Sequence, residues 1–401
     1  MKKVKKIKKR PWLFFGLLSV LAGLLCFLHW KQLHVPNDHF ATPYFSDLYF
    51  HFHNSMRSNT GFYSLVSPII RIPYMLTGSE NVAAVVFTIA LAGSTVASVL
   101  LVRYWYGMVY GKTKSRWING LALSSVMVSM LLSPRTFTGE SDAWYITTGI
   151  SPNVWHNPTT LLCRPFSLWV LIMTYKIIKA YKEEKPFGKL LFWNAWAAFM
   201  SVWAKPSFLM TFLLAFCVYL LLEIMAAKGK RKEQFLFSVK MGLSYVPAVC
   251  MVLWQYLFLF EGEKDVESGI AFRWILSASE IIKILVLSAG FVTAAAVLFS
   301  LLKMKRNVWL FGAFWLTLGL IFKAFIAETG ERATDGNFDW MLIITLFFLF
   351  MLCAGELLLK ERPALKRWEK LAVCLVSVLY GAHLVTGIAW FIRILTGTRY
   401  G

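Results

Sequence analysis

Residues 11–30 read PWLFFGLLSVLAGLLCFLHW, a predominantly apolar run that follows a strongly basic start, MKKVKKIKKR. A helix needs about 20 such residues to cross the hydrocarbon core of a bilayer. No small-residue cleavage pattern follows the run. We therefore expect an uncleaved first span with its N-terminus in the cytoplasm.

Apolar runs of this kind recur along the whole chain. Its 401 residues are 58% hydrophobic and 16% charged, whereas soluble domains are about 45–50% apolar and ~25% charged. Only helices and closed barrels satisfy their backbone within lipid. We predict an all-α polytopic membrane protein, with residues 1–401 as a single transmembrane bundle and no linker between domains. The eleven expected spans are 11–30, 81–103, 117–134, 161–179, 190–204, 207–227, 236–260, 278–302, 308–326, 340–359 and 371–392.

The net charge of +21 fits a membrane topology better than a nucleic-acid partner. Most of the 42 Lys and Arg residues fall in segments that a cytoplasmic N-terminus places inside, as the positive-inside rule requires. The six Cys residues lie in or beside apolar runs, without zinc-ligand spacing. We therefore expect membrane lipids, and no nucleic acid, as partners.

This topology places the longer and chemically more varied loops on the outer face. They are residues 31–80, 135–160, 261–277 and 327–339. Walker, GxGxxG and HExxH motifs are absent from the sequence, which leaves ATP-driven transport, dinucleotide chemistry and zincin proteolysis without support. No inverted repeat of Gly- or Pro-broken spans is visible, which counts against a secondary transporter.

The first of these loops contains a helical pattern over residues 44–58, and a Pro-broken apolar segment over 62–78 that reads as an interfacial or re-entrant helix. Asp47, His51 and Asn54 share one stripe, which predicts a helix in the membrane interface with a polar side facing a pocket. Asp47 could be a catalytic general base with His51 as its partner. The alternative is a polar interfacial face without chemistry. The apolar stripe, expected in the headgroup region, is Phe45, Leu48, Phe52 and Met56.

The second loop, 135–160, is dense in donors, acceptors and turn residues. Its Pro-bounded turns also hold Trp and His, which a plain turn does not need. We predict a binding role for this loop. The candidate substrate-binding residues are Glu140, Asp142, Asn153, Trp155, His156 and Asn157, with Arg135 as a candidate for phosphate.

Two cations, Arg164 and Lys205, each stand directly before a proline. Proline frees backbone groups and opens a polar niche, and two cations at one face suit an anion such as phosphate. The alternative is that both cations snorkel toward headgroups. In the last loop, Arg332 could bind phosphate bidentately, while Trp340 is a membrane-belt residue or a sugar platform. Further candidates for substrate there are Glu331, Asp335 and Asn337.

The chain resembles the GT-C class of membrane glycosyltransferases in having a first span, a long outer loop with an early Asp, and then a many-helix bundle. The residues that carry the resemblance are Ser46–His51, Arg135, Glu140–Asp142, Arg164, Lys205 and Glu331–Arg332. Segments 151–158, 205–208 and 335–340 are also similar to segments of uncharacterised bacterial polytopic proteins of this type.

The resemblance implies transfer of a sugar from a polyprenyl-phosphate donor on the outer side of a bacterial plasma membrane, with Asp47 as the base. The chain departs from the class in lacking a large C-terminal outer domain and an acid adjacent to Asp47. No cofactor is predicted firmly, although a divalent metal stays possible, and the acceptor could be a glycan, a lipid or a protein. The alternatives are a cell-surface polysaccharide polymerase or ligase, and a non-enzymatic lipid or solute transporter.

Overall fold

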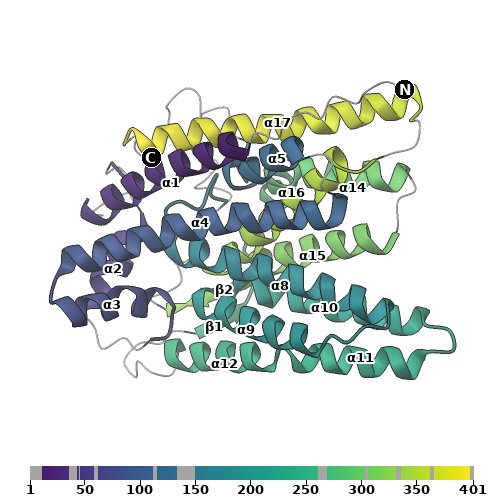
Figure 1. The fold of residues 1–401 in the computed structure, drawn as a ribbon, viewed down its shortest axis with the longest axis horizontal. Coiled ribbons are helices and arrows are strands. Elements are labelled where there is room, and N and C mark those ends of the chain that lie inside the picture. The colour runs from purple at the N-terminus through teal and green to yellow at the C-terminus, as the bar shows by residue number, and fades with distance from the viewer. Residues whose placement is uncertain are drawn as a thin grey trace.

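The computed structural model describes residues 11–35, 43–44, 46–57, 62–111, 115–132, 150–260, 269–302, 306–330, 336–361 and 365–397. These residues form mainly helices, most of which run along one long axis of the molecule (Figure 1). Six helices are long and apolar enough to cross a membrane, which indicates a membrane-embedded protein. They are α1 (Pro11–His34), α4 (Glu80–Tyr110), α8 (Pro158–Lys182), α10 (Ser207–Ala226), α16 (Asp339–Leu358) and α17 (Arg367–Leu395).

Two further spans are possible if each of two bent helix pairs crosses as one unit. The first pair, α11 (Arg231–Leu243) and α12 (Val246–Phe260), bends by 42°. Pro247 in the first turn of α12 lacks an N–H group, which interrupts the helical hydrogen bonds there. The second pair bends by 73° where Ala289 separates α13 (Ala278–Lys283) and the π-helical turn η2 (Ile284–Ser288) from α14 (Gly290–Leu301).

Three more helices coincide with the other predicted spans: α5 (Ser115–Met127), α9 (Gly188–Ala204) and α15 (Arg306–Phe325), of which α15 has a shorter apolar part, Leu310–Phe325. The prediction of a helix over 117–134 is wrong for residues 128–132, and residues 133–134 lie outside the described ranges. Residues 128–132 are irregular, and the Ser129 N–H donates to the His383 carbonyl at 3.0 Å. A Cβ on Gly387 would lie 1.9 Å from the Met127 carbonyl oxygen, so only glycine lets α17 approach this end. At 13 residues, α5 is about 20 Å long.

The first loop forms the two helices that the sequence predicts, α2 (Asp47–Arg57) and α3 (Val66–Thr77). Both lie at the left-hand end of the molecule in Figure 1. The placement of the apolar stripe in the headgroup region is wrong for Leu48 and Phe52, which are buried inside the protein. Phe52 packs parallel to Phe87 of α4 with ring centroids 6.5 Å apart. Burial against α4 removes more apolar surface from water than an interfacial position would.

The structure also contains a short antiparallel ribbon that the all-helical prediction does not include. Strand β1 (Gly269–Phe272) pairs with β2 (Ile326–Thr329), with Gly269 opposite Thr329. The Gly269 position is tight, since a Cβ there would lie 3.3 Å from the Thr329 hydroxyl. The ribbon continues directly from the end of α15 and so fixes the start of the 326–339 connection.

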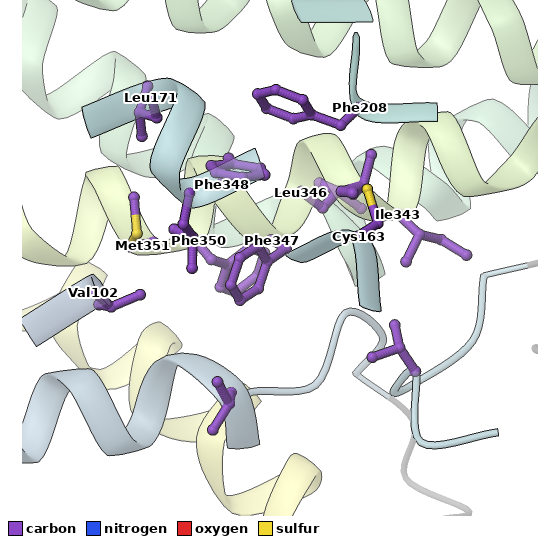
Figure 2. Close-up of a cluster of buried hydrophobic side chains, with 14 of the residues drawn as sticks. Val102, Cys163, Leu171, Phe208, Ile343, Leu346, Phe347, Phe348, Phe350 and Met351 are labelled. Atoms are coloured by element: carbon purple, nitrogen blue, oxygen red, sulfur yellow. The ribbon is translucent and has the colours of Figure 1, made fainter. Parts of the chain in front are cut away.

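Helix α16 forms the centre of the bundle. It is apolar on all sides, as expected for a helix enclosed by others. Figure 2 shows its Ile343, Phe347 and Phe348 in one cluster with Cys163 and Leu171 of α8 and Phe208 of α10. Phe208 and Phe348 have ring centroids 4.8 Å apart. Close contact with α15 is possible because a Cβ on Gly319 would already lie 3.2 Å from Leu342.

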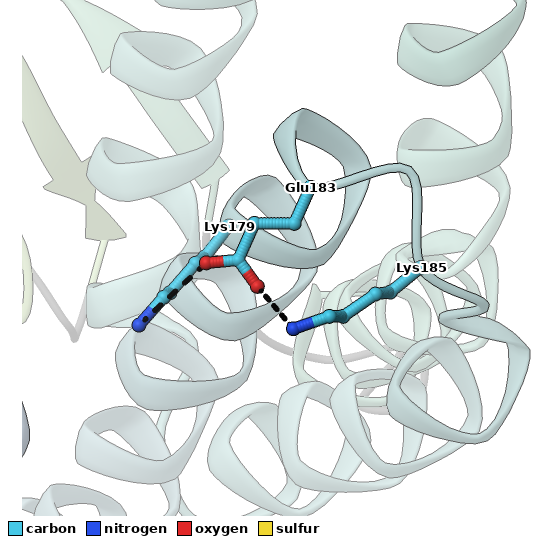
Figure 3. A network of polar contacts seen from close by, with 3 residues as sticks. All are labelled: Lys179, Glu183 and Lys185. Carbon is cyan, nitrogen blue, oxygen red and sulfur yellow. Dashed lines mark hydrogen bonds and ion pairs between the residues drawn. The ribbon is translucent and has the colours of Figure 1, made fainter.

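The C-terminal end of α8 is basic and exposed. Glu183 forms ion pairs with Lys179 at 3.8 Å and with Lys185 at 2.7 Å (Figure 3). Exposed pairs of this kind contribute only about 0–1 kcal/mol. Helix α8 therefore runs from a polar, buried start at Asn157 to a solvated basic end, and its two ends face different environments.

Candidate functional site

The start of α2 is attached to the segment that precedes α8. The Asp47 N–H donates to the His156 carbonyl at 3.0 Å, and the Asn157 side-chain N–H donates to the Asp47 carboxylate at 2.8 Å. These residues are 110 positions apart in the chain, so the contact is tertiary. Among the described residues, the other carboxylate oxygen of Asp47 has no hydrogen-bond partner.

Asn157 has two functions in this arrangement. Its side-chain oxygen caps α8 by accepting from the Thr160 N–H at 2.9 Å, and it also accepts from the Thr159 hydroxyl at 2.9 Å. Because a backbone N–H can only donate, the amide oxygen must face Thr160 and the NH₂ group must face Asp47. A cap of this kind is worth about 1 kcal/mol. The helix start thus fixes which group Asp47 meets.

Lys205 lies on the other side of Asn157. It stands between α9 and α10 and is only 8% exposed. Its ammonium group donates to the Thr159 hydroxyl at 3.1 Å and to the Asn157 side-chain oxygen at 3.5 Å, and it lies 4.7 Å from the ring centre of Trp340. Within the described part of the chain, Lys205 forms no ion pair. We call Asp47, Asn157, Thr159, Lys205 and Trp340 the Asp47–Lys205 cluster.

Two histidines border this cluster. His51 is one turn from Asp47 on α2, and the His156 ring lies 5.5 Å from that of Trp340. Burial lowers the pKa of both imidazoles, the Asp47 carboxylate opposes this effect, and Lys205 adds to it. Both rings are therefore neutral near pH 7 and can accept a proton.

The charge of Lys205 depends on a balance of the same kind. Burial lowers its pKa to about 8, although the Asp47 carboxylate raises it. Lys205 is then mostly protonated at pH 7 and loses its charge at mildly alkaline pH. The cluster thus combines a carboxylate and a cation that share one asparagine, which is suited to accepting a proton and stabilising an anion.

Further groups support the cluster from the 326–340 region. Asn337 donates to both carboxylate oxygens of the buried Glu328, at 3.1 and 2.9 Å, and Glu328 acts electrostatically on Lys205. Lys323 and Asp339 form an ion pair at 2.6 Å beside Trp340, at the start of α16. Asn337 therefore holds the Glu328 carboxylate in place and is linked to the cluster through the effect of Glu328 on Lys205.

The prediction that Arg164 and Lys205 share one phosphate niche meets a difference in depth. Arg164 is 4% exposed and lies 4.2 Å from the ring centre of Phe347. It follows Asn157 by seven residues, or about 10 Å along α8. Its Nε has no hydrogen-bond partner among the residues described. Arg164 thus faces the bundle interior, and the snorkelling alternative does not describe it.

Trp155 and Asn153, two of the predicted substrate-binding residues, stabilise the conformation of the loop before α8. Trp155 is 1% exposed and packs against Phe391 of α17, with ring centroids 5.4 Å apart. The Asn153 side-chain oxygen accepts from the Trp155 N–H at 3.1 Å. These contacts fix the turn that presents His156 and Asn157.

Several predicted site residues lie outside the described residues. They are Arg135, Glu140 and Asp142 in one segment and Glu331, Arg332 and Asp335 in another. In the described ranges, no group of three His, Cys, Asp or Glu side chains is arranged to hold a metal ion. The described residues therefore offer no set of ligands for the possible divalent metal.

The sequence did not indicate Thr159 or Glu328 as site residues, and it suggested Trp340 only as a sugar platform or a membrane-belt residue. Thr159 follows the capping Asn157 and Pro158, and a hydroxyl at that position was a usable signal. An acid directly after an apolar helix, as in Ile326-Ala327-Glu328, was another. The contact between Trp340 and Lys205 joins residues distant in sequence and had no local signal.

The fold and site define a helical membrane-embedded protein in which a half-buried carboxylate and a buried lysine form a cluster at one end of the bundle. No protein-family model matches this chain, and no curated protein or solved structure matches it. The assignment of a function therefore rests on the residues of the cluster.

Proposed function

We propose that this protein is a GT-C-type glycosyltransferase of the bacterial plasma membrane, with eleven spans and a cytoplasmic N-terminus. It moves a sugar from a polyprenyl-phosphate donor to an acceptor hydroxyl on the outer side. The observation that carries the proposal is the Asn157 side chain, which donates to Asp47 at 2.8 Å and accepts from Lys205 at 3.5 Å. It thereby places a base and a cation on two sides of one small group.

The proposed step uses both groups. The free oxygen of Asp47 takes the proton of the acceptor hydroxyl as that oxygen bonds to the anomeric carbon. The bond from the anomeric carbon to the phosphate oxygen breaks, and the lipid phosphate leaves with the bonding electron pair. Lys205 stabilises the negative charge that develops on the leaving phosphate. The donation from Asn157 keeps one carboxylate oxygen fixed, so that the other is aimed at the acceptor.

Arg164 has a separate place in this proposal. Its guanidinium lies against Phe347, whereas the Lys205 ammonium lies against Trp340, which is seven residues earlier on α16. The two charged groups therefore occupy different depths in the bundle. We assign the leaving phosphate to Lys205 and leave Arg164 as a cation that supports the donor from within the bundle. Its buried position facing Phe347 supports an interior role.

The position of the cluster favours this function over the transporter alternative. Asn157 caps α8, Lys205 lies between two helices, and Trp340 is in the first turn of α16. All three are at helix ends, whereas transporter sites lie near the bilayer midplane. A reaction at a membrane surface needs polar groups at helix ends.

The test is sugar transfer by the purified full-length protein in liposomes, with a panel of radiolabelled polyprenyl-phosphate hexoses and pentoses. Asp47→Asn should lower the rate by about 10²–10⁴-fold, because the base is lost while the shape is kept. The matched control is Glu183→Gln, an exposed acid at the other end of α8. Full activity of Asp47→Asn would end the assignment of the base. No transfer by the unaltered protein from any donor would end the proposed function.

A further inference from the structure

The side of α2 that faces away from Asp47 borders a hollow. At 3.6 residues per turn, Tyr49 and His53 lie roughly opposite Asp47 and His51. A cavity of about 290 Å³ opens there, between the end of α1, α2 and the start of α4. Its polar lining residues are His34, Tyr49, His53, Glu80 and Asn81.

The same two long helices form an apolar groove that continues from this cavity. The groove has a volume of about 320 Å³, and its lining residues are Cys26, Phe27, Trp30, Val85, Thr88 and Ile89. The two hollows are consecutive, because the rings of Trp30 and His34 lie 4.1 Å apart and Val85 follows Ala84, which lines the cavity. From His34 to Cys26, α1 covers about 12 Å.

The groove has two features that suit a hydrocarbon chain. Phe27 and Ile89 are 47% and 59% exposed, so the groove opens on the apolar surface of two helices long enough to span a membrane. Thr88 is buried within it, and its hydroxyl has no hydrogen-bond partner among the described residues. The hydroxyl is turned away from the groove, so the lining that the groove exposes is entirely apolar, as a hydrocarbon chain requires.

We propose that the cavity and the groove, together called the α1–α4 seam, bind a membrane lipid with an uncharged, hydroxylated headgroup. The headgroup occupies the polar cavity, and the hydrocarbon chain lies along the groove between α1 and α4. The cavity offers two aromatic rings, since Tyr49 and His53 lie 4.3 Å apart at an interplanar angle of 56°, and Glu80 and Asn81 can hydrogen-bond hydroxyls. This site does not depend on sugar transfer at Asp47.

The charge of the headgroup cavity disfavours an anionic headgroup. Among the described residues that line the cavity there is no Lys or Arg, and the Glu80 carboxylate would repel a phosphate. Lys31 lies beside the groove, with its ammonium group 5.8 Å from the ring centre of Phe27, and does not line the cavity. A sugar headgroup without a phosphate therefore fits the cavity better than a phospholipid headgroup does.

Native mass spectrometry of the full-length protein tests this site with two lipids of identical acyl chains, monoglucosyl diacylglycerol and phosphatidylglycerol. The unaltered protein should bind the glucosyl lipid at least about tenfold more tightly, a difference of 1.4 kcal/mol. Ile89→Trp fills the groove and should remove about tenfold of that affinity. Val86→Trp, on an exposed neighbouring position that lines neither hollow, is the control.

A charge reversal gives an independent result if groove filling alters the fold. Glu80 is exposed at the first turn of α4, and Glu80→Lys should shift the preference toward phosphatidylglycerol. Equal binding of both lipids by the unaltered protein, or equal effects of Ile89→Trp and Val86→Trp, would mean annular lipid only and would overturn the proposal. An unchanged preference in Glu80→Lys would overturn the role of the headgroup cavity.

Discussion

The two faces of α2 differ in charge although they belong to one eleven-residue helix. One face carries Asp47 and His51 and points at Lys205, a buried cation without a carboxylate partner in the described ranges. The other carries Tyr49 and His53 and borders a cavity whose charged lining residue is Glu80. One short helix thus separates a site suited to an anion from one suited to hydroxyl groups.

The difference follows from the cost of burying charge. A buried ammonium without an ion pair is expensive, and it is compatible with folding only if hydrogen bonds or an anionic ligand compensate. Lys205 has the Thr159 hydroxyl and the Trp340 ring, which compensate only in part. On the opposite side of α2, the described residues that line the cavity include no Lys or Arg, so none of them creates a need for an anion.

Among the tests of this difference between the two faces, the largest effect should come from removing that cation. Lys205→Met keeps the length of the side chain but leaves the departing phosphate without its charge, which should lower transfer by about 10²–10³-fold. The control is Lys228→Met, an exposed lysine after α10. Initial rates of sugar transfer measure both. Equal rates would remove Lys205 from the reaction.

The same lysine predicts an alkaline limit. Its pKa of about 8 means that the rate should fall as the pH rises through 8. Lys205→Arg should move this limit upward, because a guanidinium stays protonated well above that pH. A pH–rate profile between 7 and 10 measures the shift. A limit that stays in place in Lys205→Arg would assign it to another group.

A smaller effect should separate the two faces of α2. His51→Ala removes a neutral imidazole beside Asp47 and should lower transfer by about tenfold. Tyr49→Ala removes one aromatic face of the cavity and should lower the affinity for the glucosyl lipid by about tenfold. Measuring transfer and lipid binding on both variants tests the separation. If each variant changed both properties equally, α2 would carry a single site.

The smallest effect concerns stability at acid pH. Burial lowers the pKa of His51 and His156, so the unfolded chain binds more protons than the folded one just below the ordinary imidazole pKa. Stability is then fully present above about pH 6.5 and is lost as the pH falls toward the lowered values. The apparent Tm in detergent should drop by about a few degrees between pH 7 and 5. His156→Asn should reduce that drop.

Local patterns in the sequence predicted much of this arrangement. The Asp47–His51–Asn54 stripe predicted α2, and proline after Lys205 predicted the break between α9 and α10. The pattern of the third span failed because its last residues pair with α17 through His383 and Gly387, which no local signal reveals. The contacts of Glu328 and of Trp340 with Lys205 are tertiary in the same way.

The central claim is that Asn157 couples Asp47 to Lys205, and one substitution tests it directly. Asn157→Asp keeps the cap on α8, because Asp caps as well as Asn, but replaces the donor to Asp47 by a second carboxylate. Like charges raise the pKa of a carboxyl group. The pH–rate profile of Asn157→Asp should therefore show its acid limb moved to higher pH, with about 10²-fold less activity at pH 7. An acid limb and a rate equal to those of the unaltered protein would contradict the account.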